Sequence, residues 1–324
     1  MKRKLLLGSL VSALFLYLAM RDIQWSTLWD VVKRTQFRYL IPSAFFTMFG
    51  HYCRSYRWKF MMLPVKRIPT NNLFAATAVG FMANNLLPAR LGELVRAYIL
   101  GKRERVSRTA SFATIVYERV VDVFTLLVLL WVMLLKVDGP EWLRTSGAWI
   151  LVVNVALLGM MVFMERKRET FLRWVTRLAS PLPDRMQARA DRATQAFVSG
   201  LTTVTQARTL LPIALTSALV WLCAILGFYF CLLALDMHPP FVASVTLVVL
   251  VSMGTMIPSA PAYLGTTQYA CIVSLAIFGI GKSEALAYSL LYHATHFFPI
   301  TLTGLFYLWR MHIRFDELRE GGDQ

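Results

Sequence analysis

A short polar run interrupts an otherwise apolar part of the sequence. It contains two amides and three charges, at Asn84, Asn85, Arg90, Glu93 and Arg96. The three charged residues recur at intervals of three, which places them on one face of a short helix. Two guanidinium groups beside one carboxylate leave a net positive site, and guanidinium binds phosphate in a paired geometry. We therefore expect this run to bind an anionic headgroup, the alternative being a clasp of ion pairs that only holds the chain together.

A second group of charges follows in the next apolar segment. Glu118 and Asp122 are four residues apart and share a helical face, with Arg119 between them. An unpaired charge at the centre of a bilayer costs on the order of 2.5–3.5 kcal/mol on insertion scales. We therefore expect the two carboxylates to balance the arginines of the first run or to relay protons, and Arg119 to form a structural ion pair.

A third group is polar but uncharged. Tyr263 and Gln268 follow the proline pair at 258–261 and can donate hydrogen bonds to a headgroup. His293 and His296 lie three residues apart in the last apolar run. No third metal ligand accompanies them, so we expect a hydrogen-bonded or titrating His293 in a cavity, with no metal and no cofactor.

The composition excludes most other classes of protein. Of 324 residues, 57% are hydrophobic and 16% are charged, and the mean hydropathy is +0.54. Because so little charge cannot cover a water-facing surface, the chain is interpreted as an integral membrane protein, not a cytosolic enzyme or a secreted disulfide scaffold. The net charge of +16 is typical of loops that face an anionic leaflet, and no motif indicates nucleic acid. The four cysteines are expected to be buried free thiols.

Apolar runs of sufficient length indicate helices that cross the membrane. Crossing the hydrocarbon core takes about 20 apolar residues. Five runs are long enough or nearly so: 39–63, 109–135, 147–164, 210–235 and 284–309. The run at 5–20 follows a basic start as a signal peptide does, but no small-residue cleavage site follows it. We expect it to remain as an uncleaved first membrane helix.

Four shorter runs form two pairs, each broken by proline. The runs 73–88 and 91–100 are one pair, and 241–258 and 262–278 are the other. Proline ends or kinks a helix, and the freed backbone is tolerated at membrane depth only inside protein or beside water. We therefore expect two re-entrant helical hairpins, with hinge residues at Pro88, Gly92, Pro258, Pro261 and Gly265.

The breaks recur at the same interval in both halves. From Pro42 to Pro88 is 46 residues, and from Pro212 to Pro258 is also 46. Each half has three full crossings, an odd number, so the second half should be inverted relative to the first. The predicted fold is all-α: one polytopic membrane domain over 1–324, with a first repeat at 1–136 and an inverted second repeat at 147–309.

Loop charge predicts the orientation. The basic loops include both chain ends and the long Arg-rich segment 165–208, interpreted as a cytoplasmic amphipathic linker. The chain is therefore expected in the plasma (inner) membrane with both termini in the cytoplasm. Segment 21–38 is basic yet should be external, so we expect it to lie along the interface as an amphipathic helix. Arg54 and Arg57 end the run 39–63 and are interpreted as interfacial anchors, or alternatively as an access site for headgroups.

Three motifs in order resemble a known family. They are Asn85-x-x-Pro88-x-Arg90-x-Gly92-Glu93, Glu118-Arg119-x-x-Asp122, and Pro258-Ser259-Ala260-Pro261-x-Tyr263-x-Gly265. Together they resemble the membrane region of lysylphosphatidylglycerol synthase, a flippase-like family of integral membrane proteins. The resemblance implies an inverted-repeat membrane domain. It also implies movement of lipid: the best-known version translocates aminoacylated phosphatidylglycerol between leaflets, and relatives are linked to hopanoid or glycolipid pathways.

The chain departs from the family pattern in two respects. Ala262 stands where the pattern usually has Gly, which we expect to stiffen the second hairpin. Larger synthases append an aminoacyl-transfer domain after the membrane region, and we expect this chain to lack it, because little sequence follows the last apolar run. The resemblance therefore suggests lipid movement and not lysine transfer.

The leading hypothesis is a translocase for an anionic phospholipid or a lipid-linked phosphate. Its partners would be membrane lipids and lipid-synthesis enzymes, and it would not be an enzyme. The alternative is a membrane-embedded lipid-headgroup or glycosyl transferase in which Glu118 or Asp122 acts as a general base. A third hypothesis is a scaffold for a lipid pathway that transports nothing.

Overall fold

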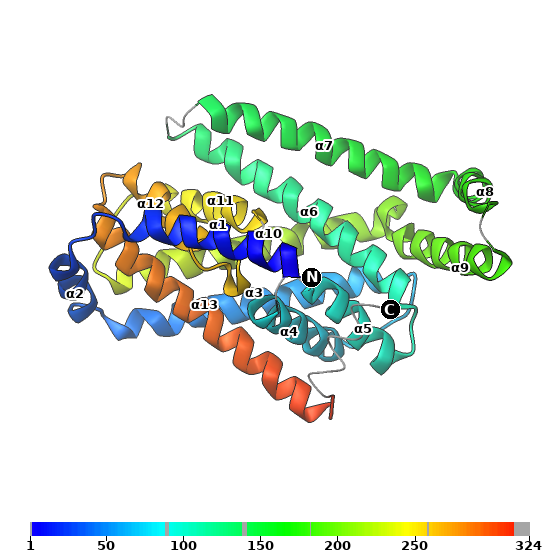
Figure 1. The fold of residues 1–324 in the computed structure, drawn as a ribbon, viewed down its shortest axis with the longest axis horizontal. Coiled ribbons are helices and arrows are strands. Elements are labelled where there is room, and N and C mark those ends of the chain that lie inside the picture. The colour runs from blue at the N-terminus through cyan, green and yellow to red at the C-terminus, as the bar shows by residue number, and fades with distance from the viewer. Residues whose placement is uncertain (1, 88–90, 138–140, 182, 258, 314–324) are drawn as a thin grey trace.

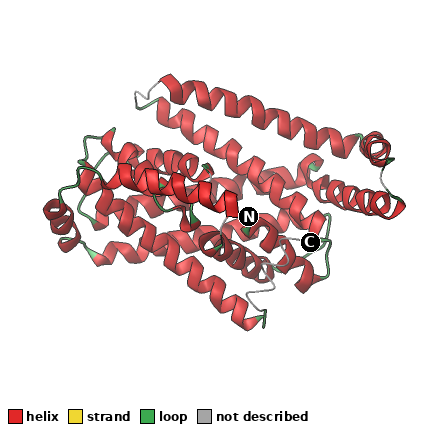
Figure 2. Cartoon of the chain, in the orientation of Figure 1, coloured by secondary structure: helices red, strands yellow, loops and turns green. Residues whose placement is uncertain are grey.

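The computed structural model describes residues 2–87, 91–137, 141–181, 183–257 and 259–313. Within these ranges every regular element is helical, as predicted (Figure 2). The first half contains α1 (Lys2–Met20), α2 (Trp25–Lys33), the 3₁₀ turn η1 (Phe37–Tyr39), α3 (Leu40–Met62), α4 (Thr70–Leu86), α5 (Gly92–Glu104) and α6 (Arg108–Leu134). The ten predicted apolar runs each fall on a helix of the structure.

The second half repeats much of this order. It contains α7 (Glu141–Arg166), α8 (Arg168–Ala179), α9 (Asp184–Leu201), the 3₁₀ turn η3 (Thr202–Thr205), α10 (Ala207–Ala234), α11 (Val242–Met256), the 3₁₀ turn η4 (Pro261–Tyr263), α12 (Thr266–Ala276) and α13 (Lys282–Arg310). In each half a long helix is followed by two short helices and another long one. The two proline-broken pairs of runs correspond to α4–α5 and α11–α12, and each pair is called a hairpin below because its two helices pack on each other.

The first helix of each hairpin ends for the same reason. Leu87 follows α4 in an extended conformation, with φ −98° and ψ 146°. Ile257 follows α11 with φ −69° and ψ 128°. Each residue precedes a proline in the sequence, and the proline ring disfavours the helical conformation of the residue before it. The spacing of the prolines therefore fixes where both hairpins break.

The helices of the two halves pack across each other. α3 runs along α10, α4 packs on α13, and α11 packs on α6. Figure 1 shows α7 beside α6 at one edge, α2 at one end of the molecule, and α8 and α9 at the opposite end. α1 lies against α12, where the Ser12 hydroxyl accepts a hydrogen bond from the Ala260 N–H (2.7 Å).

Buried apolar side chains form two clusters that share the long helices. α6 supplies Leu126, Leu127 and Leu130 to one cluster, and Ala113 and Ile115 to the other. The charged residues of α6 lie between these positions in the sequence. A polar layer therefore lies between two apolar layers of the fold.

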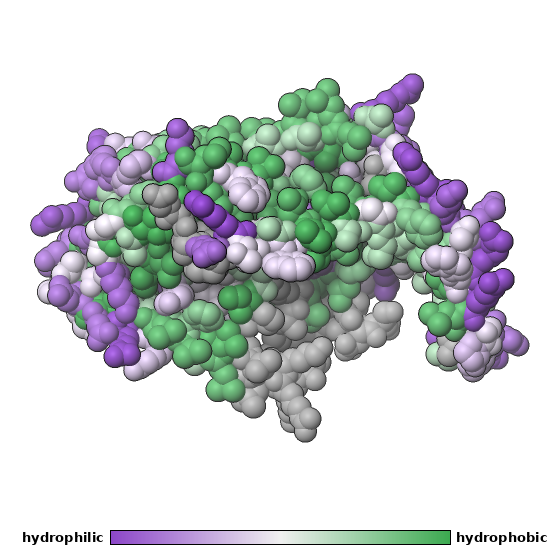
Figure 3. Space-filling view, turned by 90° about the horizontal axis from the view of Figure 1, so that it is seen from above, coloured by the Kyte–Doolittle hydropathy of each residue, from purple (hydrophilic) through white to green (hydrophobic). Residues whose placement is uncertain are grey.

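The outer surface is apolar over much of its area. Ile41, Trp149 and Leu211 are exposed by 75%, 67% and 65%, respectively, and Figure 3 shows hydrophilic residues gathered mainly at the two ends of the molecule. Soluble proteins rarely expose so many large apolar side chains. Among the described residues, two helices are long and apolar enough to cross a membrane, Arg144–Arg166 and Ala207–Ala234. α3 and α6, also predicted as crossings, carry the buried charges instead.

Close backbone contact holds the first hairpin against α13. A Cβ added at Gly304 would lie 2.4 Å from the Met82 Cβ and 2.6 Å from the Ala78 carbonyl oxygen, both on α4. Such approaches are tighter than any real contact, so a side chain at this position must push α13 away from α4. Small residues permit this kind of close packing between membrane helices.

Gly304→Ala is expected to destabilise the protein by about 1–3 kcal/mol, because overpacking a close helix contact forces the backbone to shift. The measurement is the free energy of unfolding in detergent. Gly159→Ala on α7 is the matched control, since a Cβ there meets nothing within 4 Å. Equal stability of the two variants would contradict the close packing of α4 on α13.

Candidate functional site

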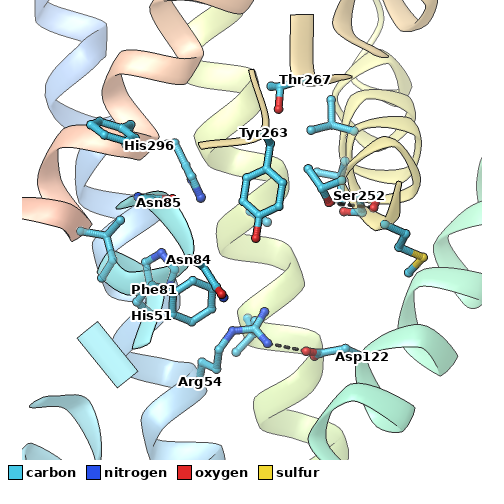
Figure 4. A pocket seen from close by; sticks show the side chains of 18 of the residues that line it. His51, Arg54, Phe81, Asn84, Asn85, Asp122, Ser252, Tyr263, Thr267 and His296 are labelled. Atoms are coloured by element: carbon cyan, nitrogen blue, oxygen red, sulfur yellow. Dashed lines mark hydrogen bonds and ion pairs between the residues drawn. The ribbon is translucent and has the colours of Figure 1, made fainter. Parts of the chain in front are cut away.

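A cavity of about 350 Å³ lies between the two hairpins. Its walls come from both halves of the chain: α3, α4, α5 and α6 on one side, and α10, α11, η4, α12 and α13 on the other. Figure 4 shows Tyr263 projecting from η4 into this space toward Arg54, with Asn84 and Asn85 on the opposite wall. The volume is typical of a site for a small molecule or a lipid headgroup.

Glu118 is the centre of a network of buried ion pairs beside the cavity. Its side chain is fully buried, and Arg96 donates to both carboxylate oxygens, from Nη1 at 3.0 Å and from Nη2 at 2.9 Å. Arg54 donates a third bond from Nη1 at 3.3 Å. Glu118 therefore joins α3, α5 and α6 through charge-assisted hydrogen bonds.

Asp122 forms the second centre, one helical turn further along α6. Arg57 donates to its Oδ1 from Nη2 at 2.7 Å, and Arg54 donates to its Oδ2. The Arg57 side chain is fully buried and also donates from Nη1 to the Ser217 hydroxyl of α10, at 2.9 Å. The prediction that Arg57 is an interfacial anchor is therefore wrong, because its guanidinium lies in the interior between α3, α6 and α10.

Arg96 also contacts an aromatic ring. Its guanidinium carbon lies 3.7 Å from the centroid of Trp58, and the Trp58 indole N–H donates to the Thr114 hydroxyl at 2.8 Å. A guanidinium over an indole face gains cation–π attraction. The sequence placed Arg96 among the headgroup-binding residues, but Arg96 and Glu118 do not belong to the described residues that line the cavity. Both lie behind the cavity wall.

Arg119 and Glu93 are the more accessible charges of the network. Their side chains are 40% and 26% exposed, and their closest atoms are 3.8 Å apart. Arg119 also lies 3.6 Å from Asp122, so its closest ion pair is longer than the closest pairs of Arg57 (2.7 Å) and Arg96 (2.9 Å). Arg54, Arg119, Glu93 and Asp122 line the cavity. Arg119 is therefore the cation best able to exchange a protein carboxylate for a ligand anion.

The network carries a small excess of positive charge. Its members among the described residues are four arginines and three carboxylates: Arg54, Arg57, Arg96, Arg119, Glu93, Glu118 and Asp122. One formal positive charge is left over. Arg96, one of the two arginines predicted to make the site positive, belongs to this network. Arg90, the other, lies outside the described residues.

The two predicted amides hold the first hairpin in place. The Asn84 Oδ1 accepts the Gly92 N–H at 2.8 Å, which satisfies a free donor at the start of α5. The Asn85 Nδ2 donates to the Thr301 hydroxyl of α13 at 2.8 Å. Both residues also line the cavity. Gly92 is needed as glycine, because a Cβ there would lie 2.1 Å from the Gly80 carbonyl oxygen.

The second hairpin turns through left-handed backbone. Ala262, Tyr263 and Gly265 have φ of +60°, +57° and +86°. The left-handed region favours glycine, so Ala262 and Tyr263 hold a backbone conformation that residues with a Cβ rarely adopt. Gln268 was predicted to bind ligand, but its Oε1 accepts the Gly265 N–H at 2.7 Å, so it braces the turn. Pro261 begins η4.

Several histidines meet at the cavity. His51, His293 and His296 all line it, and the His51 and His296 rings are 5.7 Å apart. Among the described residues, no group of three or more His, Cys, Asp or Glu side chains is arranged to hold a metal. The four cysteines are free and buried, as predicted. Pro88 and Pro258 lie outside the described residues.

Sequence reasoning missed three residues of the site. Arg54 was interpreted mainly as an anchor, and His51 and Trp221 were given no role, yet all three line the cavity. The three-residue spacing of His51 and Arg54 could have indicated that both point into the site, because it puts them on one face of α3. For Trp221 the sequence offers no such signal, because it lies in a continuous apolar run.

The exposed apolar surface and the buried ionic network define the class of the protein: an all-helical membrane protein with a polar cavity at its centre. Residues 5–304 match the family described as the lysylphosphatidylglycerol synthase TM region. The chain belongs to this family, as its three motifs suggested.

Two relatives illustrate how far the similarity extends. A UPF0104 membrane protein of Methanothermobacter thermautotrophicus is 25% identical over 248 residues, which cover 72% of this chain and 73% of the relative. A UPF0104 membrane protein of Methanocaldococcus jannaschii is 28% identical over 236 residues, which cover 71% of this chain and 95% of the relative. Both names place the relatives in the membrane and assign no reaction.

Glu118→Gln is expected to destabilise the protein by about 3–5 kcal/mol, because it leaves the buried Arg96 without its counter-ion and removes one of the two carboxylates that pair with Arg54. Glu93→Gln should change stability by less than about 1 kcal/mol, since Glu93 is partly exposed and loosely paired. The measurement is the unfolding free energy of both variants in detergent. If Glu118→Gln is as stable as Glu93→Gln, Glu118 is not the centre of the network.

Proposed function

We propose that this protein is a translocase that moves an anionic phospholipid or a lipid-linked phosphate between the two leaflets. The observation that carries the proposal is the cavity between the hairpins, which Arg54 and Arg119 line together with apolar side chains of both halves. A phosphate has the charge and the acceptor geometry that these guanidiniums recognise. The membership of a lipid-related membrane family supports the same conclusion.

The proposed architecture is a pair of inverted repeats. Support comes from the matched contacts of the two halves: α4 packs on α13 as α11 packs on α6, and α3 packs on α10. Both hairpins break before a proline and line the same cavity. Re-entrant hairpins that meet near the bilayer centre give alternating access to one site, which is how many transporters work.

The hairpins also provide a path for acyl or prenyl tails. Large apolar side chains beside the two breaks are exposed: Leu86, Leu94, Met256 and Leu264. Exposed apolar residues next to a polar cavity suit a ligand that is half lipid, because the tails can remain in the bilayer while the headgroup enters. A soluble anion would not need exposed apolar residues beside its binding site.

Transport of the headgroup requires that its phosphate compete with protein carboxylates. Arg119 is paired at 3.6 Å or more with Glu93 and Asp122. A phosphate entering the cavity can displace Glu93, which is partly exposed and can turn toward solvent. Glu118 and Asp122 remain paired with Arg54, Arg57 and Arg96, so Glu93 can pair with Arg119 again after release.

The proposed orientation follows from the charged ends of the molecule. α8 and α9 contain many arginines and lie at one end (Figure 1). The positive-inside rule assigns that end to the cytoplasm. With this assignment the protein is a multi-pass protein of the plasma membrane with cytoplasmic termini, and α2 lies at the outer interface.

A transferase is less well supported. Such an enzyme would use Glu118 or Asp122 as a general base, but Arg96 and Arg54 hold Glu118, and Arg57 and Arg54 hold Asp122. A carboxylate that accepts this many charge-assisted bonds is a poor proton acceptor. The network is therefore better suited to balancing charge than to catalysis.

The test is a translocation assay in proteoliposomes that contain fluorescent phosphatidylglycerol. Wild-type protein should expose the inner-leaflet label to an external quencher faster than protein-free vesicles do. Arg119→Gln should lose most of this activity, on the order of tenfold or more, because one charge-assisted bond to phosphate is lost. Arg173→Gln is the matched control, since Arg173 is exposed on α8.

The proposal fails if wild-type protein and empty vesicles give the same rate. It also fails if Arg119→Gln and Arg173→Gln transport equally well. A lipid product of altered mass in the vesicles would instead favour the transferase.

A further inference from the structure

The cavity has a second polar region that the ionic network does not use. The Trp221 Nε1 and both ring nitrogens of His51 are buried and have no hydrogen-bond partner among the described residues. Both side chains line the cavity. Buried polar groups are nearly always hydrogen bonded, so three unpartnered atoms on two side chains of one cavity wall point to a ligand that satisfies them.

The two residues lie on α3 and α10, which pack along each other. Gly50 precedes His51, and a Cβ added to it would lie 3.3 Å from the Cys223 Cβ of α10. The His51 ring is fixed between aromatic neighbours, 4.4 Å from the Phe81 ring and 5.7 Å from the His296 ring. Figure 4 shows His51, Phe81 and His296 on the same side of the cavity, above Arg54.

The donors and acceptors of this region restrict the ligand. An indole N–H only donates, whereas a neutral imidazole donates from one nitrogen and accepts at the other. Hydroxyl groups fit this set, because one hydroxyl can accept from the Trp221 N–H and another can accept from, or donate to, a ring nitrogen of His51. An ammonium group fits poorly, because it has no acceptor to offer the indole N–H.

The charges around the cavity also disfavour a cationic substituent. Of the described residues that line it, only Glu93 and Asp122 are acidic, and both are engaged by Arg119. The walls near His51 and Trp221 instead include aromatic faces, with the rings of Phe228 and Tyr292 stacked at 3.9 Å. Aromatic walls pack well against the C–H groups of a polyol or a sugar.

We infer that His51 and Trp221 form a hydroxyl-binding subsite, so that the ligand is a phosphodiester lipid with an uncharged, hydroxyl-bearing headgroup. This inference rests on the proposed function, since it assigns the phosphate to Arg54 and Arg119. The cavity of about 350 Å³ has room for such a headgroup beyond its phosphate. The guanidiniums supply charge recognition, and the subsite selects among anionic lipids.

The test compares lipids that differ only in their hydroxyl groups. Detergent-solubilised, immobilised protein is loaded with radiolabelled phosphatidylglycerol and challenged with unlabelled competitors. Phosphatidylpropanol has the same headgroup carbon count and charge without the two hydroxyls, and it should compete about tenfold less well. Lysyl-phosphatidylglycerol, which adds cationic groups, should also compete less well than phosphatidylglycerol.

Variants of the two residues test whether a preference for the hydroxyl-bearing lipid comes from the subsite. Trp221→Phe and His51→Phe should each reduce the preference for phosphatidylglycerol over phosphatidylpropanol several-fold while leaving phosphatidylpropanol binding unchanged. Trp149→Phe is the matched control, because Trp149 is exposed on α7. The thermal midpoint of each variant shows that it is folded.

The inference is overturned if the two lipids compete equally in wild type, or if the variants weaken both lipids alike. It is also overturned if lysyl-phosphatidylglycerol binds most tightly. In each case, retained binding of phosphatidylpropanol would leave the proposed phosphate site standing. If free glycerol 3-phosphate binds as tightly as phosphatidylglycerol, the hydroxyl subsite is supported while the lipid nature of the proposed substrate is refuted.

Discussion

The need to neutralise buried charge governs this structure. Glu118 and Asp122 are held inside an apolar bundle by arginines from two other helices. A buried carboxylate without these partners would be strongly destabilising, and so would the guanidiniums without the carboxylates. α3, α5 and α6 must therefore approach one another at one level of the bundle. The cavity lies at this level because the charges prevent the apolar layers from closing over it.

The short helices of the hairpins follow from the same requirement. Arg96 reaches Glu118 from α5, which begins only at Gly92. An uninterrupted helix through residues 70–104 would place Arg96 about 39 Å from the start of the helix, away from α6. The break after Leu87 folds α5 back against α4, where Gly80 and Gly92 allow the backbones to touch. Proline and glycine thus bring distant charges together.

The sequence predicts the helices well and the site only partly. Apolar run length and the residue before each proline determine where helices end, and both are local properties. The direction in which a side chain points depends on how its helix is rotated against its neighbours. Arg54 and Arg57 have the spacing of an interfacial anchor and equally that of an inward ion pair, and the packing of α3 on α10 decides between them. Gln268 likewise braces a turn that only the fold reveals.

The contact of α1 with the second hairpin means that the two halves are interleaved. Ser12 accepts the Ala260 N–H, and a side chain at Gly265 would collide with the Ser12 carbonyl oxygen at 2.5 Å. The Phe15 and Tyr269 rings also lie 5.3 Å apart. The first helix therefore supports a turn that belongs to the second half of the chain. A protein cut between its halves would separate this turn from the helix that supports it, so the two halves have to assemble as one unit.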